Sequence, residues 1–103
     1  MVNAIQAFTA CEPPYIDIPN AFSPNGDDLN DQFRILGSVI EEIHVRIYNR
    51  WGEKVFESED LDHWWDGTFR GKKVIPDVYG YIVEVGCFGG QKYLSKGNVT
   101  VLY

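Results

Sequence analysis

The sequence lacks long apolar runs. A membrane-spanning helix needs about 18 apolar residues in a row, and no run approaches that length, so we expect a chain that does not cross a bilayer. Basic residues are also scarce, because nine Lys and Arg face fifteen Asp and Glu and the formal net charge is −6. A charge of this sign repels nucleic acid phosphates and anionic lipid headgroups at long range. The composition therefore disfavours nucleic acid binding.

Side chains that carry out catalysis are equally sparse. The two histidines, His44 and His63, fall on a predicted strand and in an acidic loop, and neither lies in the local setting of an activated nucleophile. Asp62 and Asp66 flank a tryptophan pair in the manner of a glycosidase carboxylate pair, but this spacing is common by chance. The sequence therefore predicts a protein that is not an enzyme.

The 103 residues fit one domain with one core. Residues 1–10 lack the basic start and the sustained apolar stretch of a signal peptide, so an exported protein is expected to extend beyond this sequence as a longer precursor. We expect residues 1–10 to be a flexible N-terminal segment or a remnant of the preceding region, and residues 11–103 to form a single β-sandwich domain.

Alternation of apolar and polar residues recurs several times, whereas no window carries helical spacing over three turns. The clearest strand is predicted at 43–48, with 53–57 as its hairpin partner. Residues 78–85 form the longest predicted strand and are apolar on both faces, which is typical of a strand inside a sandwich. Further short elements are predicted as strands at 15–19, 33–35, 92–95 and 98–103 and as one helical turn at 36–42. About seven strands predict an all-β fold, an immunoglobulin-like antiparallel β-sandwich.

Two cysteines lie near opposite ends of the chain, without the short Cys or His spacing of a zinc site. Cys11 and Cys87 either form a disulfide that ties the N-terminal segment to a late strand or remain two separate buried thiols. Both interpretations stay open, because the sequence does not show whether the two Cα atoms lie within the about 7 Å that a bridge tolerates.

Oxygen-bearing side chains are concentrated in the loop from Ser23 to Asp31. Calcium takes about six to eight oxygen ligands, and residues at every second position of a loop can supply them. A complete EF-hand loop is excluded. Where that motif requires a glycine this chain has Asp28, and where it requires a bidentate acidic ligand this chain has Arg34. The alternative is a metal-free loop, in which Asn25-Gly26 is a turn and the acidic residues cap backbone N–H groups. The candidate calcium ligands are Ser23, Asn25, Asp27, Leu29, Asn30 and Asp31.

The aromatic residues allow a second binding hypothesis, in which a flat platform stacks against sugars. This hypothesis predicts a calcium-dependent carbohydrate-binding or adhesion module. The favoured interpretation is that the same residues fill the core and corners of the domain, as most tryptophans of small sandwiches do. The residues concerned are Trp51, Trp64, Trp65, Tyr48, Tyr79 and Tyr81.

Several blocks in a fixed order resemble a known family. They lie at residues 18–27 with 30–33, 47–58, 65–68, 71–72, 78–81 and 97–102. Over about residues 14–103 they are similar to the gliding motility-associated C-terminal domain, also called the type B sorting domain of the type IX secretion system of Bacteroidota. The chain departs from the family pattern by Asp28 and Asp77 where glycines are usual, and by Tyr103 where a basic residue is usual.

The resemblance implies a domain that directs a large cargo protein across the outer membrane by protein–protein recognition, without catalysis. Its partners would be the type IX secretion machinery, including a PorP/SprF-like outer-membrane protein, and the cargo region upstream in the same polypeptide. The cargo would pass through the periplasm to the cell surface or medium. Besides the 23–31 loop, the candidate contact residues are Asn49, Arg50, Trp51 and Gly52 of the predicted hairpin tip and Trp65, Asp66 and Gly67 of a corner.

Overall fold

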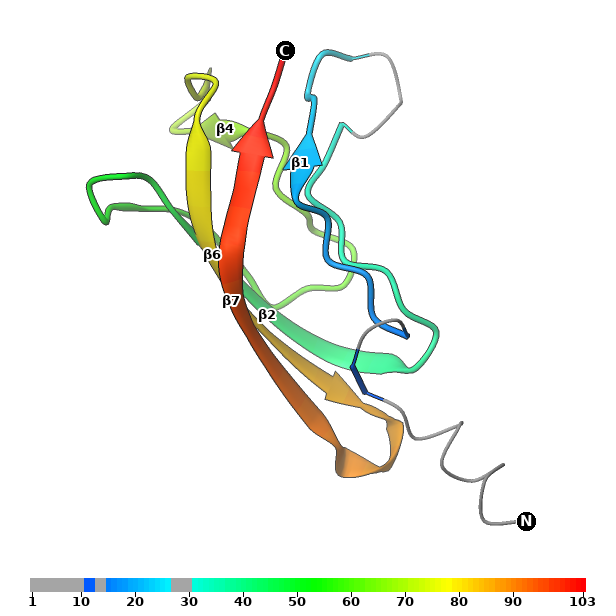
Figure 1. Ribbon diagram of the computed structural model, residues 1–103. Helices are drawn as coiled ribbons and strands as arrows, with labels where there is room; N and C mark the ends of the chain where they lie inside the picture. The colour runs from blue at the N-terminus through cyan, green and yellow to red at the C-terminus, as the bar shows by residue number, and fades with distance from the viewer. Residues whose placement is uncertain (1–10, 13–14, 27–30) are drawn as a thin grey trace.

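The computed structural model describes residues 11–12, 15–26 and 31–103, which form an all-β fold (Figure 1). The all-β part of the prediction is therefore confirmed, whereas its uniformly antiparallel pairing is wrong, because one strand pair is parallel. The part of the chain that the structure describes contains no helix with the length and apolarity of a membrane span. The elements are β1 (Ala21–Phe22), β2 (Ile40–Tyr48), β3 (Lys54–Ser58), β4 (Thr68–Phe69), β5 (Lys72–Lys73), β6 (Val78–Cys87), the 3₁₀ turn η1 (Phe88–Gly90) and β7 (Lys92–Val101).

One five-stranded sheet, in the order β1-β7-β6-β2-β3, forms the frame of the domain, and β4 and β5 make a separate hairpin. β1 pairs with β7 in parallel, and every other pair is antiparallel, so the sheet is mixed. One face of the frame is covered by irregular segments of the chain (Figure 1). Within the described residues these segments are joined by two isolated bridges, Asp17–Leu36 and Phe33–Trp65.

The strand boundaries differ from the sequence prediction in several places. The helical turn expected at 36–42 is wrong, because Ile40 already pairs with Cys87 and β2 continues from there. The predicted strands at 15–19 and 33–35 are each reduced to a single bridge, at Asp17 and Phe33, and the two last predicted strands are one strand, β7. β7 runs through Gly97, where the Tyr81 ring from β6 occupies the space that a side chain would need.

The core lies between the inner face of the sheet and the covering segments. The two faces of β6 differ in burial. Val83 and Val85 on the inner face are buried, while Val78 on the outer face is 48% exposed. The apolar residues on the other face of β6 therefore stay at least partly exposed, because only one face has a covering layer. The core residues are Cys11, Ile16, Phe22, Phe33, Ile35, Ile43, Val45, Ile47, Val55, Trp64, Trp65, Tyr79, Val83, Val85, Cys87, Val99 and Val101.

A disulfide joins Cys11 to Cys87, with 6.0 Å between their Cα atoms. Cys87 ends β6, so the bond fixes the start of the described chain against the end of the longest antiparallel pair. The two cysteines are separated by 76 positions in the sequence. A cross-link over a loop of this length removes much of the conformational freedom of the unfolded chain.

Replacing both cysteines by alanine should lower the free energy of unfolding by about 4 kcal/mol, because the unfolded chain regains the entropy of the open loop. Denaturant unfolding of the oxidised parent and of the Cys11→Ala/Cys87→Ala variant measures the difference. The reduced parent is the matched control and should fall to nearly the same value. A loss below about 1 kcal/mol in both would contradict the stabilising role of the bond.

Candidate functional site

The turn between β2 and β3 holds a tryptophan in solvent. Asn49 organises this turn, because its Oδ1 accepts hydrogen bonds from the backbone N–H groups of Trp51 and Glu53 at 3.0 and 2.9 Å. Gly52 has φ of 81°, a left-handed conformation that glycine adopts at little cost. Trp51 is 74% exposed at the tip. The predicted hairpin tip therefore exists and presents one large aromatic side chain on a fixed backbone.

Arg50 ties this tip to the segment before β6. Its guanidinium lies 2.7 Å from Asp77 Oδ1 and 5.9 Å from the centre of the Trp51 ring. The hydrogen bond from Arg50 holds the pKa of Asp77 below its ordinary value, and the N–H of Val78 contributes to the same shift. Asp77, a departure from the family pattern, thus anchors the tip. Arg50 is therefore already paired, whereas Trp51 is left exposed at the tip.

Trp65 does not lie on the surface, contrary to its expected role as a contact residue. Its side chain is 1% exposed, and its Nε1–H donates to the Thr68 carbonyl at 3.0 Å. The indole packs on Phe22 and Tyr79, with ring centres 5.4 and 5.2 Å away. Trp64 is also buried. Burial of both indoles is contrary to the sugar-stacking platform and agrees with the core interpretation.

Asp66 and Gly67 complete the corner after Trp65. Asp66 Oδ1 accepts hydrogen bonds from the N–H and the hydroxyl of Thr68, at 3.1 and 2.6 Å. Gly67 has φ of 80°, and a Cβ placed on it would lie 2.8 Å from a side-chain carbon of Pro24. The corner therefore packs directly against the start of the acidic loop, and only a residue without a side chain fits there.

Of the predicted calcium ligands, Ser23, Asn25 and Asp31 are described, while Asp27, Leu29 and Asn30 lie outside the described residues. Asp31 Oδ1 accepts a hydrogen bond from the Gly26 N–H at 3.1 Å, as the metal-free turn requires. The described residues hold no group of three acidic, His or Cys side chains placed for a metal ion. Calcium binding by the whole loop stays a prediction.

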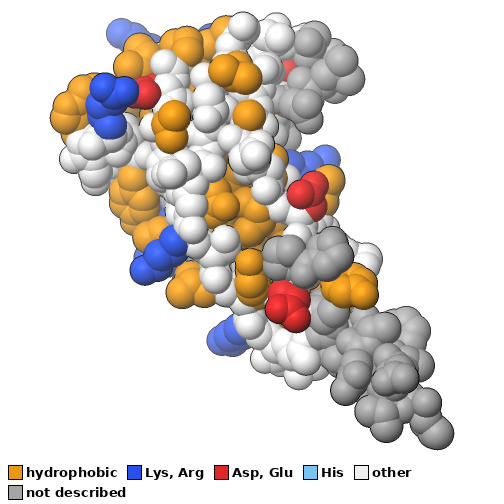
Figure 2. Space-filling model, in the orientation of Figure 1, with side chains coloured by type: hydrophobic (Ala, Val, Ile, Leu, Met, Phe, Trp, Pro, Cys, Tyr) orange, Lys and Arg blue, Asp and Glu red, His pale blue; other side chains and the backbone are white. Residues whose placement is uncertain are grey.

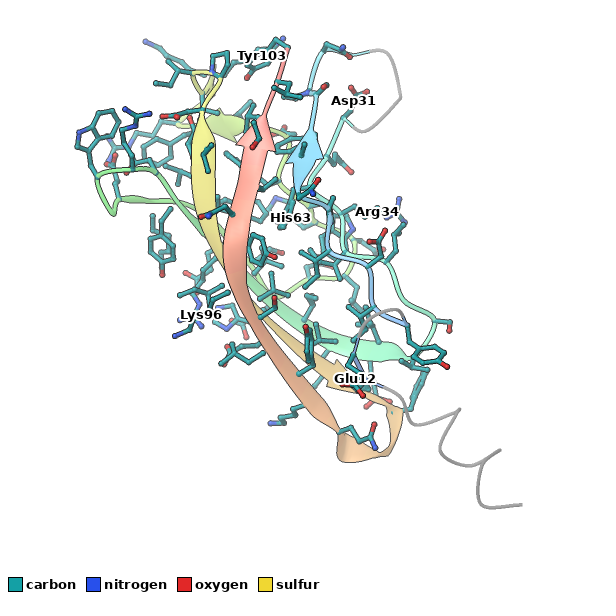
Figure 3. All side chains as sticks on the ribbon, viewed as in Figure 1. Glu12, Asp31, Arg34, His63, Lys96 and Tyr103 are labelled. Atoms are coloured by element: carbon teal, nitrogen blue, oxygen red, sulfur yellow. A yellow bond between two sulfur atoms is a disulfide. The ribbon has the colours of Figure 1, made fainter. Side chains whose placement is uncertain are left out.

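The loop and the corner meet at one hollow of about 550 Å³. Asp31 of the loop and Asp66 of the corner both line it, together with Asp17 and Arg34. Figure 3 shows Asp31 and Arg34 on the covering segments, beside the sheet. The structure thus brings two of the predicted contact regions together.

A charge network on the outer face of the sheet was missed by the sequence analysis. His44 Nε2 lies 2.6 Å from Glu57, and Glu84 lies within 3.4 Å of His44 and 3.2 Å of Arg46. A hydrogen bond from Lys54, then one from His44, lowers the pKa of Glu57 to about 2. The strand order β6-β2-β3 brings Glu84 beside His44 and Arg46, which are distant from it in sequence, whereas Lys54 and Glu57 are three residues apart on β3.

The ordinary pKa of Glu57 is 4.5 and its folded value is about 2, so its contribution to stability is present above pH 4.5 and is lost as the pH falls through 2. The free energy of unfolding should therefore decline over this interval. Denaturant unfolding at a series of pH values should show a smaller decline for Glu57→Gln than for the parent. Glu59→Gln, in the exposed loop that follows, is the control, and equal declines in all three proteins would contradict this prediction.

Gly67→Ala should destabilise the domain more than Gly71→Ala. Both residues have φ of 80°, so both alanines are strained, by about 1 kcal/mol. A Cβ at Gly71 meets no atom within 4 Å, whereas one at Gly67 meets Pro24. The contact should add about 1 kcal/mol or more to the loss in unfolding free energy. Equal losses would show that the corner does not depend on this packing.

Comparison with known proteins identifies the family. No curated protein matches the chain. A family model described as the CHU_C type IX secretion signal domain matches residues 16–101, from the first covering segment to the end of β7. This match confirms the resemblance of the sequence blocks, and it gives the chain a role in directing cargo secretion rather than in catalysis. The chain belongs to the family of CHU_C type IX secretion signal domains, the gliding motility-associated C-terminal domains.

Proposed function

We propose that this secretion signal is read as a folded surface, with the Trp51 tip as its principal contact, by a PorP/SprF-like outer-membrane protein. Membership of the family implies contact with the type IX machinery and a secreted or cell-surface destination. The cargo would reach that partner from the periplasm. The observation that carries the proposal is Trp51, which is 74% exposed on a turn that its neighbours hold rigid.

The physical support for this assignment is the cost of binding. A rigid aromatic side chain loses little conformational entropy when it enters a pocket, and Trp is enriched among the residues that dominate interfaces. Asn49 and the Arg50–Asp77 pair fix the backbone on both sides of Trp51 before any partner arrives. The tip is therefore preorganised for recognition, whereas Trp65 is buried in the core.

We also infer that the fold is a reduced immunoglobulin-like sandwich. The order β7-β6-β2-β3 corresponds to strands G, F, C and C′ of such domains. The covering segments then take the place of the second sheet. The segment at Asp17 corresponds to strand A, the segment from Phe33 to Leu36 to strand B and the segment at Trp65 to strand E, and the two isolated bridges join them. This inference is supported by the common core between the two layers, to which Ile16, Phe33 and Ile35 contribute from the covering side.

Fusing the 103-residue chain to the C-terminus of a periplasmic reporter should bring the reporter to the surface or medium of a type IX host. Trp51→Ala should lower the exported fraction by about tenfold, as expected for an interface residue worth about 1.4 kcal/mol. Cell fractionation with immunoblotting and protease accessibility measures both.

Phe88→Ala is the matched control, because Phe88 is a 54% exposed aromatic residue at the opposite end of β6 from the tip. It should be exported like the parent. A parent fusion that stays in the periplasm would overturn the secretion role of the domain. Equal export of the parent and Trp51→Ala would show that recognition lies elsewhere on the surface.

A further inference from the structure

β7 has an open backbone edge over most of its length. On one side it pairs with β6 from Lys92 to Thr100, and on the other it pairs with β1 only at Thr100 and Val101. Figure 1 shows β1 beside the C-terminal end of β7 alone. Among the described residues, no strand covers the other edge of β7 from Lys92 to Val99.

The direction of the backbone groups on this edge follows from the bonds to β1. Thr100 N–H donates to the Asn20 carbonyl at 2.9 Å, and Leu102 N–H donates to the Phe22 carbonyl at 3.0 Å. Because backbone groups alternate sides along a strand, the N–H and C=O groups of Leu94, Lys96 and Asn98 face the same edge. Within the described part of the chain, no backbone hydrogen bond to another segment reaches those groups.

The chain leaves β7 before Asn20. The carbonyls of Asn20 and Phe22 are the β1 groups that face β7, so by alternation Pro19 faces the side away from β7. The residues before Pro19 turn to the covering layer, where Asp17 exchanges hydrogen bonds with Leu36 at 2.8 and 3.0 Å. Within the described residues, the path of the chain therefore leaves the edge of β7 open.

The side chains of the open segment give the edge a chemical character. Lys92, Leu94 and Lys96 are exposed and follow at every second position, which places them on one face of the strand. Leu94 is 56% exposed. Neither lysine takes part in an ion pair within the described residues. Figure 3 shows Lys96 beside β7, on the side away from Arg34.

We propose that this edge accepts an extended segment of a partner protein as an additional strand, in which acidic side chains flank an apolar one. Its backbone would complete the ladder at Leu94, Lys96 and Asn98, and its carboxylates would lie opposite the two lysines, where opposite charges stabilise a cross-strand pair. A second copy of this chain is the weaker occupant, because it brings the same lysines and a net charge of −6. Assigning the partner to the secretion machinery rests on the proposed function, whereas the binding mode rests on the edge.

A peptide experiment tests the edge without any secretion. The 103-residue protein is titrated with an end-capped octapeptide that carries Glu, Val and Glu at every second position with Thr between them, and amide hydrogen exchange is followed by NMR. The amides of Leu94, Lys96 and Asn98 should exchange about tenfold more slowly with the peptide present, as for a site occupied to about 90%. The same peptide with Lys in place of both Glu is the control and should give no protection. Unchanged exchange, or equal protection by both peptides, overturns the proposal.

Variants of Lys96 separate the backbone from the charge. Lys96→Pro removes the N–H that faces the edge, Lys96→Glu reverses the charge, and Lys96→Ala removes the charge alone. With the acidic peptide, the first two should lose protection at Leu94 and Asn98, and Lys96→Ala should retain part of it. Arg34→Glu, an equal charge reversal on the other side of the molecule, should behave as the parent. If Lys96→Pro does not fold, Lys96→Glu decides the result.

The reporter fusion links this edge to secretion. A parent that is exported while folded Lys96→Glu is retained supports both proposals. A parent that stays periplasmic overturns the secretion role, and the peptide titration then decides the edge alone. Export of Lys96→Glu at the parent level overturns the edge as a contact in secretion. Sedimentation of the parent and Lys96→Ala completes the test, because dimerisation through β7 would identify a second copy as the occupant and overturn the acidic partner.

Discussion

The burial of Trp65 is the interaction on which the rest of this domain depends. Its ring contacts Phe22 of β1 and Tyr79 of β6, and its carbonyl accepts the Phe33 N–H within the covering layer at 2.8 Å. One residue therefore joins the sheet to the segments that cover it. Without a regular second sheet, the covering layer has few backbone ladders of its own, so aromatic packing and the disulfide to Cys11 must hold it in place.

This arrangement separates the residues that hold the domain together from those that a partner can reach. The corner after Trp65 is rigid because Gly67 packs on Pro24, and the tip of the β2–β3 hairpin is rigid because Arg50 is paired with Asp77. On the face shown in Figure 2, hydrophobic side chains lie in separate groups among polar and charged ones. Recognition of such a surface depends on a few fixed groups rather than on a large apolar area.

The sequence revealed those parts of the fold whose signal is local. Ile43, Val45 and Ile47 alternate with polar residues, and this pattern correctly placed the centre of β2. Two-residue β1 is too short to show periodicity, because its pairing is set by distant β7. The need for glycine at position 97 of β7 comes from Tyr81 of a neighbouring strand. The motif around Trp65 was recognised, but a motif does not show which of its members are buried. The charge network required the strand order, which no local pattern contains.

The path of the chain before β1 connects the stability of the domain to its means of recognition. The residues before Pro19 lie in the covering layer, where Ile16 enters the core, and within the described residues the edge of β7 is left uncovered. An open edge exposes a protein to aggregation, and exposed lysines on an edge strand reduce that hazard. At Lys92 and Lys96 the same charges that discourage self-association of an acidic protein favour a partner strand of opposite charge. The open edge can then be selective. Its backbone groups can pair with any extended segment, whereas its lysine side chains favour segments that carry acidic residues.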